Sequence, residues 1–151
     1  MIDRVLFVCT GNICRSPMAE GLLRARLAGR AGSLVASAGI AALLGSPADP
    51  MALALLAERG VDLSSHRARQ LTSPMIEAFD LVLVMEARQV RLVEALSPAA
   101  RRRVRTIGER GRFDVPDPYG GDRAAFARAL ALIERGLDDL APALGLPPPG
   151  R

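Results

Sequence analysis

Short, unbroken apolar runs alternate along the chain with longer stretches in which apolar positions recur at helical spacing. The apolar runs are rich in strand-forming residues and predict four strands, at residues 4–8, 34–37, 81–85 and 104–107. The amphipathic stretches predict four helices, at residues 16–29, 49–59, 86–96 and 122–144. Strands separated by helices imply right-handed crossovers. We therefore expect an α/β fold in which a four-stranded parallel sheet carries helices on both faces.

Single residues mark where these elements begin and end. Asp49 is a suitable N-cap for the second predicted helix, and Gly60 follows that helix as a stop signal. Pro17 suits the first turn of the first helix, because its missing N–H would be unpaired there anyway. Ligands of parallel α/β sheets bind at the carboxyl ends of the strands. We therefore expect the chemistry in the loop that follows the first strand.

The chain length of 151 residues fits one domain. We assign residues 1–145 to this domain and the proline-rich residues 146–151 to a flexible tail. No apolar run is long enough to cross a bilayer, and the first residues lack the features of a signal peptide, so we expect no membrane insertion. With only two cysteines, Cys9 and Cys14, the chain is expected in a reducing compartment, the cytoplasm.

The net charge is +4, and every basic residue is an arginine. A positive surface speeds encounter with anionic partners such as phosphorylated proteins. The densest basic run, residues 101–105, is interpreted as a solvated helix end that leads into a strand. The few aromatic residues are scattered along the chain, so the sequence offers no base-stacking surface and no nucleic-acid partner is expected.

The loop after the first strand reads CTGNICRS, from Cys9 to Ser16. A tight turn between a strand and a helix can direct several backbone N–H groups at one point, which makes it a phosphate-binding loop. Gly11 permits the turn, and Asn12 tolerates the left-handed conformation that such loops contain. A thiol at the floor of this nest is favoured as the nucleophilic thiolate. The planar fork of Arg15 matches two phosphoryl oxygens.

The cysteines have two other possible interpretations. Cys9 could be a buried core thiol, which is the commoner role of a free cysteine, but this does not explain Arg15 in the same loop. Cys9 and Cys14 could ligate a metal, but two further ligands would be required. We therefore expect neither a metal nor another cofactor.

A phenolate is a poor leaving group, so attack on a phosphate ester calls for a carboxylic acid that protonates it. The candidate is Asp117 in the stretch FDVPDPYGG, which follows the last predicted strand. Without the first loop, Asp117 would be interpreted as a turn residue, because Asp-Pro often opens turns. Asp114 is the fallback acid. The single histidine, His66, suits a supporting network that reaches Asn12 or Ser37.

The sequence resembles the low-molecular-weight protein tyrosine phosphatases over nearly its whole length. The likeness rests on VLFVCTGNICRSPMAEG, SAGI, GVDLSSHRARQL, DLVLVME and DVPDPYGG, which match in order and spacing. The resemblance implies a four-stranded parallel sheet and no metal. It also implies that Cys9 is the nucleophile, Arg15 the phosphate clamp and Asp117 the general acid.

The resemblance assigns roles to further residues. Residues of the phosphate-binding loop would be Thr10, Gly11, Asn12, Ile13, Cys14 and Ser16, with the Ser16 hydroxyl bound to the thiolate. Asn12, Ser37 and His66 would hold the loop in shape. The substrate crevice would include Leu43, Leu44 and Tyr119. Cys14 corresponds to a second loop cysteine that can form a reversible, protective disulfide with the nucleophile.

Two segments depart from the pattern of many family members. Leu43 and Leu44 stand where an aromatic crevice wall is common, and Gly120 follows Tyr119 where a second aromatic residue is frequent. The leucine-containing variant resembles the bacterial branch that dephosphorylates tyrosine autokinases of polysaccharide export. The expected partner is therefore a phosphotyrosine-containing protein, such as one of these autokinases, and the expected state is a monomer or weak dimer.

Two other functions compete with that of a phosphatase. A thioredoxin-coupled arsenate reductase has a similar loop, but it needs further cysteines late in the chain, and none follows Cys14. A non-catalytic phosphotyrosine-binding module would bind without turnover. The joint presence of Cys9, Arg15 and Asp117 favours an enzyme.

Overall fold

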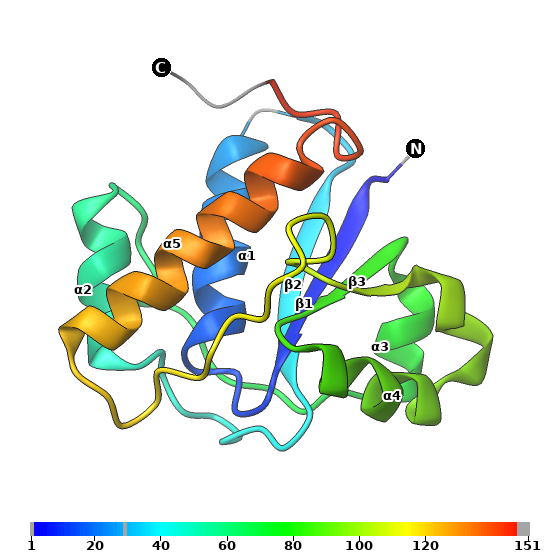
Figure 1. Cartoon of the computed structure of the whole chain (residues 1–151), viewed down its shortest axis with the longest axis horizontal. Coiled ribbons are helices and arrows are strands. Elements are labelled where there is room, and N and C mark those ends of the chain that lie inside the picture. Colours follow the sequence, from blue (N-terminus) through cyan, green and yellow to red (C-terminus); the bar gives the residue numbers. More distant parts are fainter. Residues whose placement is uncertain (1, 29, 148–151) are drawn as a thin grey trace.

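The computed structural model describes residues 2–28 and 30–147 (Figure 1). Four parallel strands form one sheet in the order β2-β1-β3-β4. The strands are β1 (Arg4–Cys9), β2 (Leu34–Gly39), β3 (Leu81–Val84) and β4 (Val104–Thr106). The helices are α1 (Arg15–Arg26), α2 (Pro50–Glu58), α3 (Ser73–Ala78), α4 (Ala87–Leu96), the 3₁₀ helix η1 (Pro98–Arg103) and α5 (Arg123–Leu140). The predicted fold class is confirmed.

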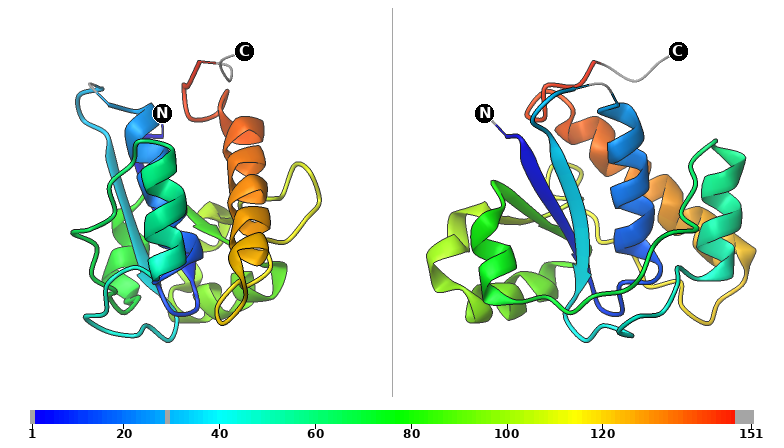
Figure 2. Two further views of the ribbon diagram at one scale, coloured as in Figure 1. Left: turned by 90° about the vertical axis from the view of Figure 1, so that its left-hand side faces the viewer. Right: turned by 180° about the vertical axis from the view of Figure 1, so that it is seen from behind.

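Helices cover both faces of the sheet, so alternate strand residues enter two separate cores. Helices α1, α2 and α5 lie on one face, and α3 and α4 lie on the other (Figures 1 and 2). On β1, Val5 and Phe7 pack toward the first group of helices, whereas Leu6 and Val8 pack toward the second. Burial on both faces explains why these strands read as unbroken apolar runs.

The local stop and start signals act as predicted. Asp49 caps α2, where its side chain accepts a hydrogen bond from the Met51 N–H, and Gly60 follows the helix with a φ of 74°. Helix α1 begins one residue earlier than predicted, at Arg15, and ends at Arg26, whereas its predicted end at Gly29 lies outside the described residues.

The prediction was wrong at three other places. It ran the last helix to residue 144, but α5 ends at Leu140, because Pro142 lacks the N–H that would continue the helix. It also missed α3 and η1, which have six residues each. Such short helices show little periodicity, and their stability comes from packing.

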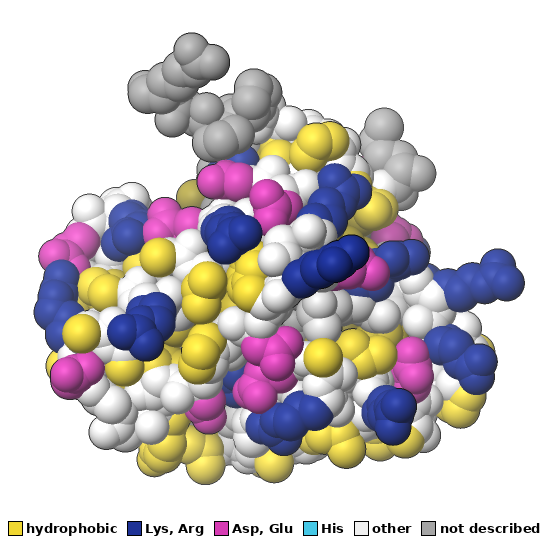
Figure 3. Space-filling model, viewed as in Figure 1, with side chains coloured by type: hydrophobic (Ala, Val, Ile, Leu, Met, Phe, Trp, Pro, Cys, Tyr) yellow, Lys and Arg dark blue, Asp and Glu magenta, His cyan; other side chains and the backbone are white. Residues whose placement is uncertain are grey.

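The structure describes the arginine-rich run that begins at residue 101, but only the first two residues of the predicted tail, 146–151. Residues 101–103 form the end of η1, directly before β4, and on the face drawn in Figure 3 arginine side chains are interspersed with acidic ones. Most of the predicted tail lies outside the described residues, and within the described part Leu146 is buried in the core. Among the described helices, none is both long and apolar enough to cross a membrane.

Candidate active site

The loop between β1 and α1 has its carbonyl groups turned outward and tied to neighbouring segments. The carbonyls of Thr10, Gly11 and Ile13 accept hydrogen bonds from the N–H groups of Ala41, Leu43 and Asp49, at 2.8–3.0 Å. No described residue accepts a hydrogen bond from the N–H groups of Gly11, Ile13, Cys14 or Arg15. These donors are therefore available to an anion, as in a phosphate-binding nest.

The Cys9 sulfur lies at the end of β1 and receives hydrogen bonds from this loop and from α1. The Asn12 N–H donates to Sγ at 3.3 Å, and the Ser16 Oγ lies 2.9 Å from Sγ. The Asn12 side-chain amide donates to the same Ser16 oxygen at 2.8 Å. Because Ser16 accepts this bond, its own proton is free to point at the sulfur, which favours a negatively charged thiolate there.

Asn12 is fully buried and holds the loop from inside. Its φ of 60° is the left-handed conformation predicted from the sequence. Its side-chain amide donates to Ser37 Oγ at 2.9 Å, and its Oδ1 accepts from the Arg69 N–H at 2.9 Å. The His66 Nε2 lies 2.7 Å from the Asn12 carbonyl, so this nitrogen carries the proton. Ser37 in turn donates to Glu20.

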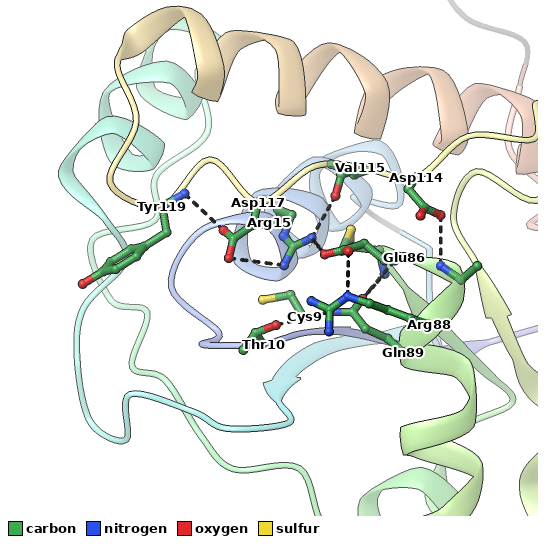
Figure 4. Close-up of polar contacts among 12 residues, drawn as sticks. Cys9, Thr10, Arg15, Glu86, Arg88, Gln89, Asp114, Val115, Asp117 and Tyr119 are labelled. Carbon is green, nitrogen blue, oxygen red and sulfur yellow. Dashed lines mark hydrogen bonds and ion pairs between the residues drawn. The ribbon is translucent and has the colours of Figure 1, made fainter.

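Arg15 is 1% exposed and points into the space above Cys9 (Figure 4). Its Nη1 donates to Glu86 Oε1 at 2.6 Å and to the Val115 carbonyl at 2.8 Å. Its Nη2 lies 3.7 Å from Asp117 Oδ2, and its buried Nε has no partner among the described residues. The guanidinium is thus oriented by one nitrogen, while its other edge can meet an oxyanion.

Glu86 is a site residue to which the sequence analysis assigned no role. It binds both Arg15 and Arg88, whose Nε donates to Glu86 Oε2 at 2.9 Å. Burial opposes the charge of Glu86, but the hydrogen bonds from Arg88 and Arg15 outweigh it and lower the pKa of this carboxyl. Gln89 also joins the site, because its side-chain amide donates to the Thr10 hydroxyl at 3.3 Å.

The two candidate acids have different surroundings (Figure 4). Asp117 lies in the loop before α5, its side chain is 47% exposed, and its Oδ1 accepts a hydrogen bond from the Tyr119 N–H at 3.1 Å. Asp114 accepts from the Ala87 N–H at 2.9 Å, at the start of α4, and does not line the pocket described below. The geometry therefore favours Asp117 as the acid.

A pocket of about 170 Å³ opens above the loop. Cys9, Arg15 and Asp117 line it together, and Ile13, Leu43 and Tyr119 give it apolar walls. Its further lining residues are Thr10, Gly11, Cys14 and Ala41. Leu44 was predicted in the crevice but does not line this pocket and is 74% exposed. The Leu43 N–H is bound to the loop, and the turn that follows directs the next side chain outward.

Cys14 shares the pocket with Cys9, and both are free thiols. Burial, together with the nearby negative charges of Asp49, Cys9 and Asp117, strongly raises the pKa of the Cys14 thiol. Burial thus opposes ionisation of Cys14, whereas the Cys9 sulfur lies within hydrogen-bond distance of the Asn12 N–H and the Ser16 hydroxyl. Among the described residues, no cluster of three or more His, Cys, Asp or Glu side chains could hold a metal.

The family model for low molecular weight phosphotyrosine protein phosphatase matches residues 4–146. The chain belongs to this family. It is 49% identical over 142 residues to the probable low molecular weight protein-tyrosine-phosphatase EpsP of Ralstonia solanacearum, across 94% of this chain and 96% of the relative. The predicted family and enzyme class are thereby confirmed.

Solved structures of relatives have the same fold. Wzb of Vibrio vulnificus, in complex with benzylphosphonate, superposes with a TM-score of 0.88 at 38% identity, covering 95% of this chain and 99% of that protein. The YwlE arginine phosphatase from Geobacillus stearothermophilus superposes with a TM-score of 0.86 at 35% identity, covering 94% and 92%. Relatives with this fold thus include proteins named as tyrosine phosphatases and one named as an arginine phosphatase. The fold alone therefore does not identify the substrate of this chain, and the lining of the pocket has to distinguish the two.

Proposed function

We propose that this phosphatase hydrolyses phosphotyrosine in proteins through a cysteinyl-phosphate intermediate. The observation that carries the proposal is the set of free N–H groups around the Cys9 sulfur, closed on one side by the Arg15 guanidinium. These donors can surround three phosphoryl oxygens while the sulfur meets the phosphorus. A core thiol would need neither the free donors nor Arg15, and a pure binding module would not need the acid Asp117 in the same pocket.

In the first step, the Cys9 thiolate attacks phosphorus and forms the S–P bond, while the P–O bond to the tyrosine breaks. Asp117, as the carboxylic acid, gives its proton to the departing phenolate oxygen. The loop N–H groups and Arg15 stabilise the charge on the three remaining phosphoryl oxygens. Glu86 serves as a positioning residue, because its hydrogen bond to Nη1 fixes the Arg15 fork.

In the second step, the Asp117 carboxylate takes a proton from a water molecule, and the water oxygen attacks phosphorus. The S–P bond breaks, the electron pair returns to Cys9 as the thiolate, and inorganic phosphate leaves. The Ser16 hydroxyl stabilises that thiolate as a leaving group, since it lies 2.9 Å from Sγ. Partial exposure of Asp117 gives water access to this carboxylate.

The pocket walls favour an aromatic ring over a guanidinium as the group that carries phosphate. Ile13, Leu43 and Tyr119 offer apolar contact, and Asp117 is the only carboxylate among the lining residues. A phosphoarginine side chain would need polar partners for its remaining nitrogens, and burying them unpaired is costly. We therefore assign phosphotyrosine, not phosphoarginine, as the substrate.

Rapid-quench mass spectrometry tests the chemistry with a phosphotyrosine peptide. We expect a transient phosphate on Cys9 of the wild-type chain and none at this position in the Cys9→Ala variant, whose side chain has no atom that could accept it. Turnover of the matched phosphoarginine peptide should be at least tenfold slower. Stoichiometric binding without turnover by the wild-type chain would instead identify a binding module, and faster turnover of phosphoarginine would reverse the substrate assignment.

We extend the proposal to a tyrosine autokinase of polysaccharide export as the physiological partner. The family resemblance supports it, and so does the similarity to EpsP. Because Cys9 must stay a free thiol, we assign the reaction to a reducing compartment, the cytoplasm. We also propose that the enzyme is a monomer or a weak dimer. A Cys9→Ser trap should recover the phosphorylated autokinase from an extract of its own cell, whereas recovery of other phosphoproteins alone would refute this partner. Sedimentation velocity measures the oligomeric state.

A further inference from the structure

A second hollow lies on the opposite side of the phosphate loop, along the free edge of β2. It has a volume of about 450 Å³ and is bounded by α1, β2 and the segment that leads from α2 to α3. Figure 2 shows β2 at the edge of the sheet, with that segment crossing its carboxyl end. Below, this hollow is called the edge groove, and its polar lining residues are Glu20, Arg24, Ser37, Asp62, Ser65, His66, Arg67 and Arg69.

The backbone of β2 offers unused donors to the edge groove. The Leu34 and Ile40 N–H groups bind toward β1, so the even-numbered residues face the sheet and the odd-numbered ones face outward. Val35 and Ser37 therefore direct both their N–H and C=O groups into the groove. No described residue accepts a hydrogen bond from either N–H group.

The outward carbonyls, in contrast, are already occupied. The Arg24 guanidinium donates to the Val35 carbonyl at 2.8 Å, and the Arg69 Nε donates to the Ser37 carbonyl at 3.0 Å. An added β-strand needs both the donors and the acceptors of a sheet edge. The edge groove offers only donors, so its chemistry fits an oxyanion and not a peptide strand.

The charged side chains of the edge groove also favour an oxyanion as its ligand. Glu20 is neutralised within the structure, because its carboxylate binds Arg24 at 2.6 Å and accepts from Ser37. Arg67 and Arg69 form no ion pair with any described residue, and their guanidinium groups contact backbone carbonyls. Asp62 is the one other acidic side chain that lines the edge groove. The two guanidinium groups without an ion-pair partner therefore exceed the one remaining carboxylate, and the net charge of the groove is positive.

We propose that the edge groove is a second anion site, which binds a small molecule through a phosphate or carboxylate group. The Val35 and Ser37 N–H groups and the unpaired nitrogens of Arg67 and Arg69 would bind the oxyanion. The site is separate from the catalytic pocket, because the two share no lining residue. Ser37 and His66 also contact Asn12, so an anion in the groove meets residues that hold the phosphate loop.

Titration of the ¹⁵N-labelled full chain tests this site, because each pocket has its own backbone amides. Inorganic phosphate and citrate are added in separate experiments. We expect saturable shifts of the Val35 and Ser37 amide signals with at least one of them, and the effective anion identifies the preferred group. The Gly11 and Ile13 amides line the catalytic pocket, and the anion concentration that half-saturates their shifts is compared with that for Val35 and Ser37, so failure of one site is distinguishable from failure of the other.

The double variant Arg67→Gln/Arg69→Gln should weaken binding at Val35 and Ser37 by about tenfold or more, since two charge-assisted donors are lost. The response of the Gly11 amide should stay unchanged. Arg67→Gln alone provides a milder variant, because the Arg67 guanidinium contacts only the carbonyls of Ser64 and His66.

Arg91→Gln, an exposed position on α4, is the matched control and should bind as the wild type does. The proposal is overturned if neither anion shifts the Val35 and Ser37 amides. It is equally overturned if Arg67→Gln and the double variant bind with wild-type affinity at these amides.

Discussion

The two halves of the active site are held in opposite ways. On the nucleophile side, Asn12, Arg15 and Ser16 are buried. Asn12 and Arg15 make hydrogen bonds to distant parts of the chain, and Ser16 binds within the loop itself. On the acid side, Asp117 and Tyr119 are exposed, and the Tyr119 N–H is the only donor among the described residues that forms a hydrogen bond to the Asp117 side chain. Val115 anchors the acid loop at its base, where its N–H donates to the Met85 carbonyl at 2.9 Å.

The contrast has a chemical reason. Stabilisation of an oxyanion depends on donors that are already in place when charge develops, so the phosphate loop must be rigid. The acid has to approach a bulky leaving group and later a water molecule, so it benefits from an open, mobile loop. Mutations in the phosphate loop should therefore affect both stability and activity, whereas mutations in the acid loop should affect activity alone.

The largest effect is expected for Cys9→Ser. Loss of the thiolate nucleophile should lower kcat on p-nitrophenyl phosphate by about 10⁴-fold or more, because the covalent route is removed. Steady-state kinetics measure this effect, and a thermal melt checks that the fold persists. Retention of even a hundredth of the wild-type rate would identify another nucleophile.

Asp117→Asn should lower kcat on phosphotyrosine by about 10²–10³-fold, because the phenolate must then leave without a proton. Hydrolysis of p-nitrophenyl phosphate should fall much less, since p-nitrophenolate leaves readily without protonation. The free energy of unfolding should change by less than about 0.5 kcal/mol, as expected for an exposed side chain.

Asp114→Asn is the matched control, because this carboxylate caps the N-terminal end of α4 and lies outside the pocket. It should leave the ratio of the two substrates at the wild-type value. An equal fall with both substrates in Asp117→Asn would assign the acid to another group.

Asn12→Ala should lower the free energy of unfolding by about 2–4 kcal/mol. The change leaves the Arg69 N–H without its acceptor, removes one donor from each of the buried Ser16 and Ser37 hydroxyls, and places alanine at a positive φ. Urea denaturation measures the loss. Tyr119→Ala, from the acid loop, should change stability by less than about 0.5 kcal/mol, and equal losses in the two variants would contradict the contrast between the loops.

The smallest effect concerns Glu86 and pH. Because the pKa of Glu86 is lower in the folded chain, its ionised form stabilises the fold, fully so above the ordinary value of about 4.5. This contribution is lost as the pH falls through the lower folded pKa. Urea denaturation between pH 3 and 7 should show that the wild type exceeds Glu86→Gln in stability at pH 7 and loses that advantage in acid. An advantage that grows toward acid pH would contradict the assignment.

Much of the fold was predictable because its signals are local. The four strands are short apolar runs, and the caps at Asp49 and Asp122 lie next to the helices that they begin. The missed helix α3 carries the same signal, since Thr72 caps it and Pro74 lies in its first turn. Its six residues are too few to show a helical period, so the capping signal alone did not predict a helix there.

The sequence alone determined the family, the four strands and the loop from Cys9 to Ser16, because each motif and each apolar run behind them is a short local pattern that can be read without knowing the packing. Tertiary structure decided the rest of the site. Glu86 lies 71 positions from the arginine that it orients, and Val115 lies 100 positions away. Asp114 and Asp117 are three residues apart in one loop, yet only Asp117 lines the pocket. Contacts between distant segments depend on how the helices pack on the sheet, and no local pattern of side chains encodes that packing.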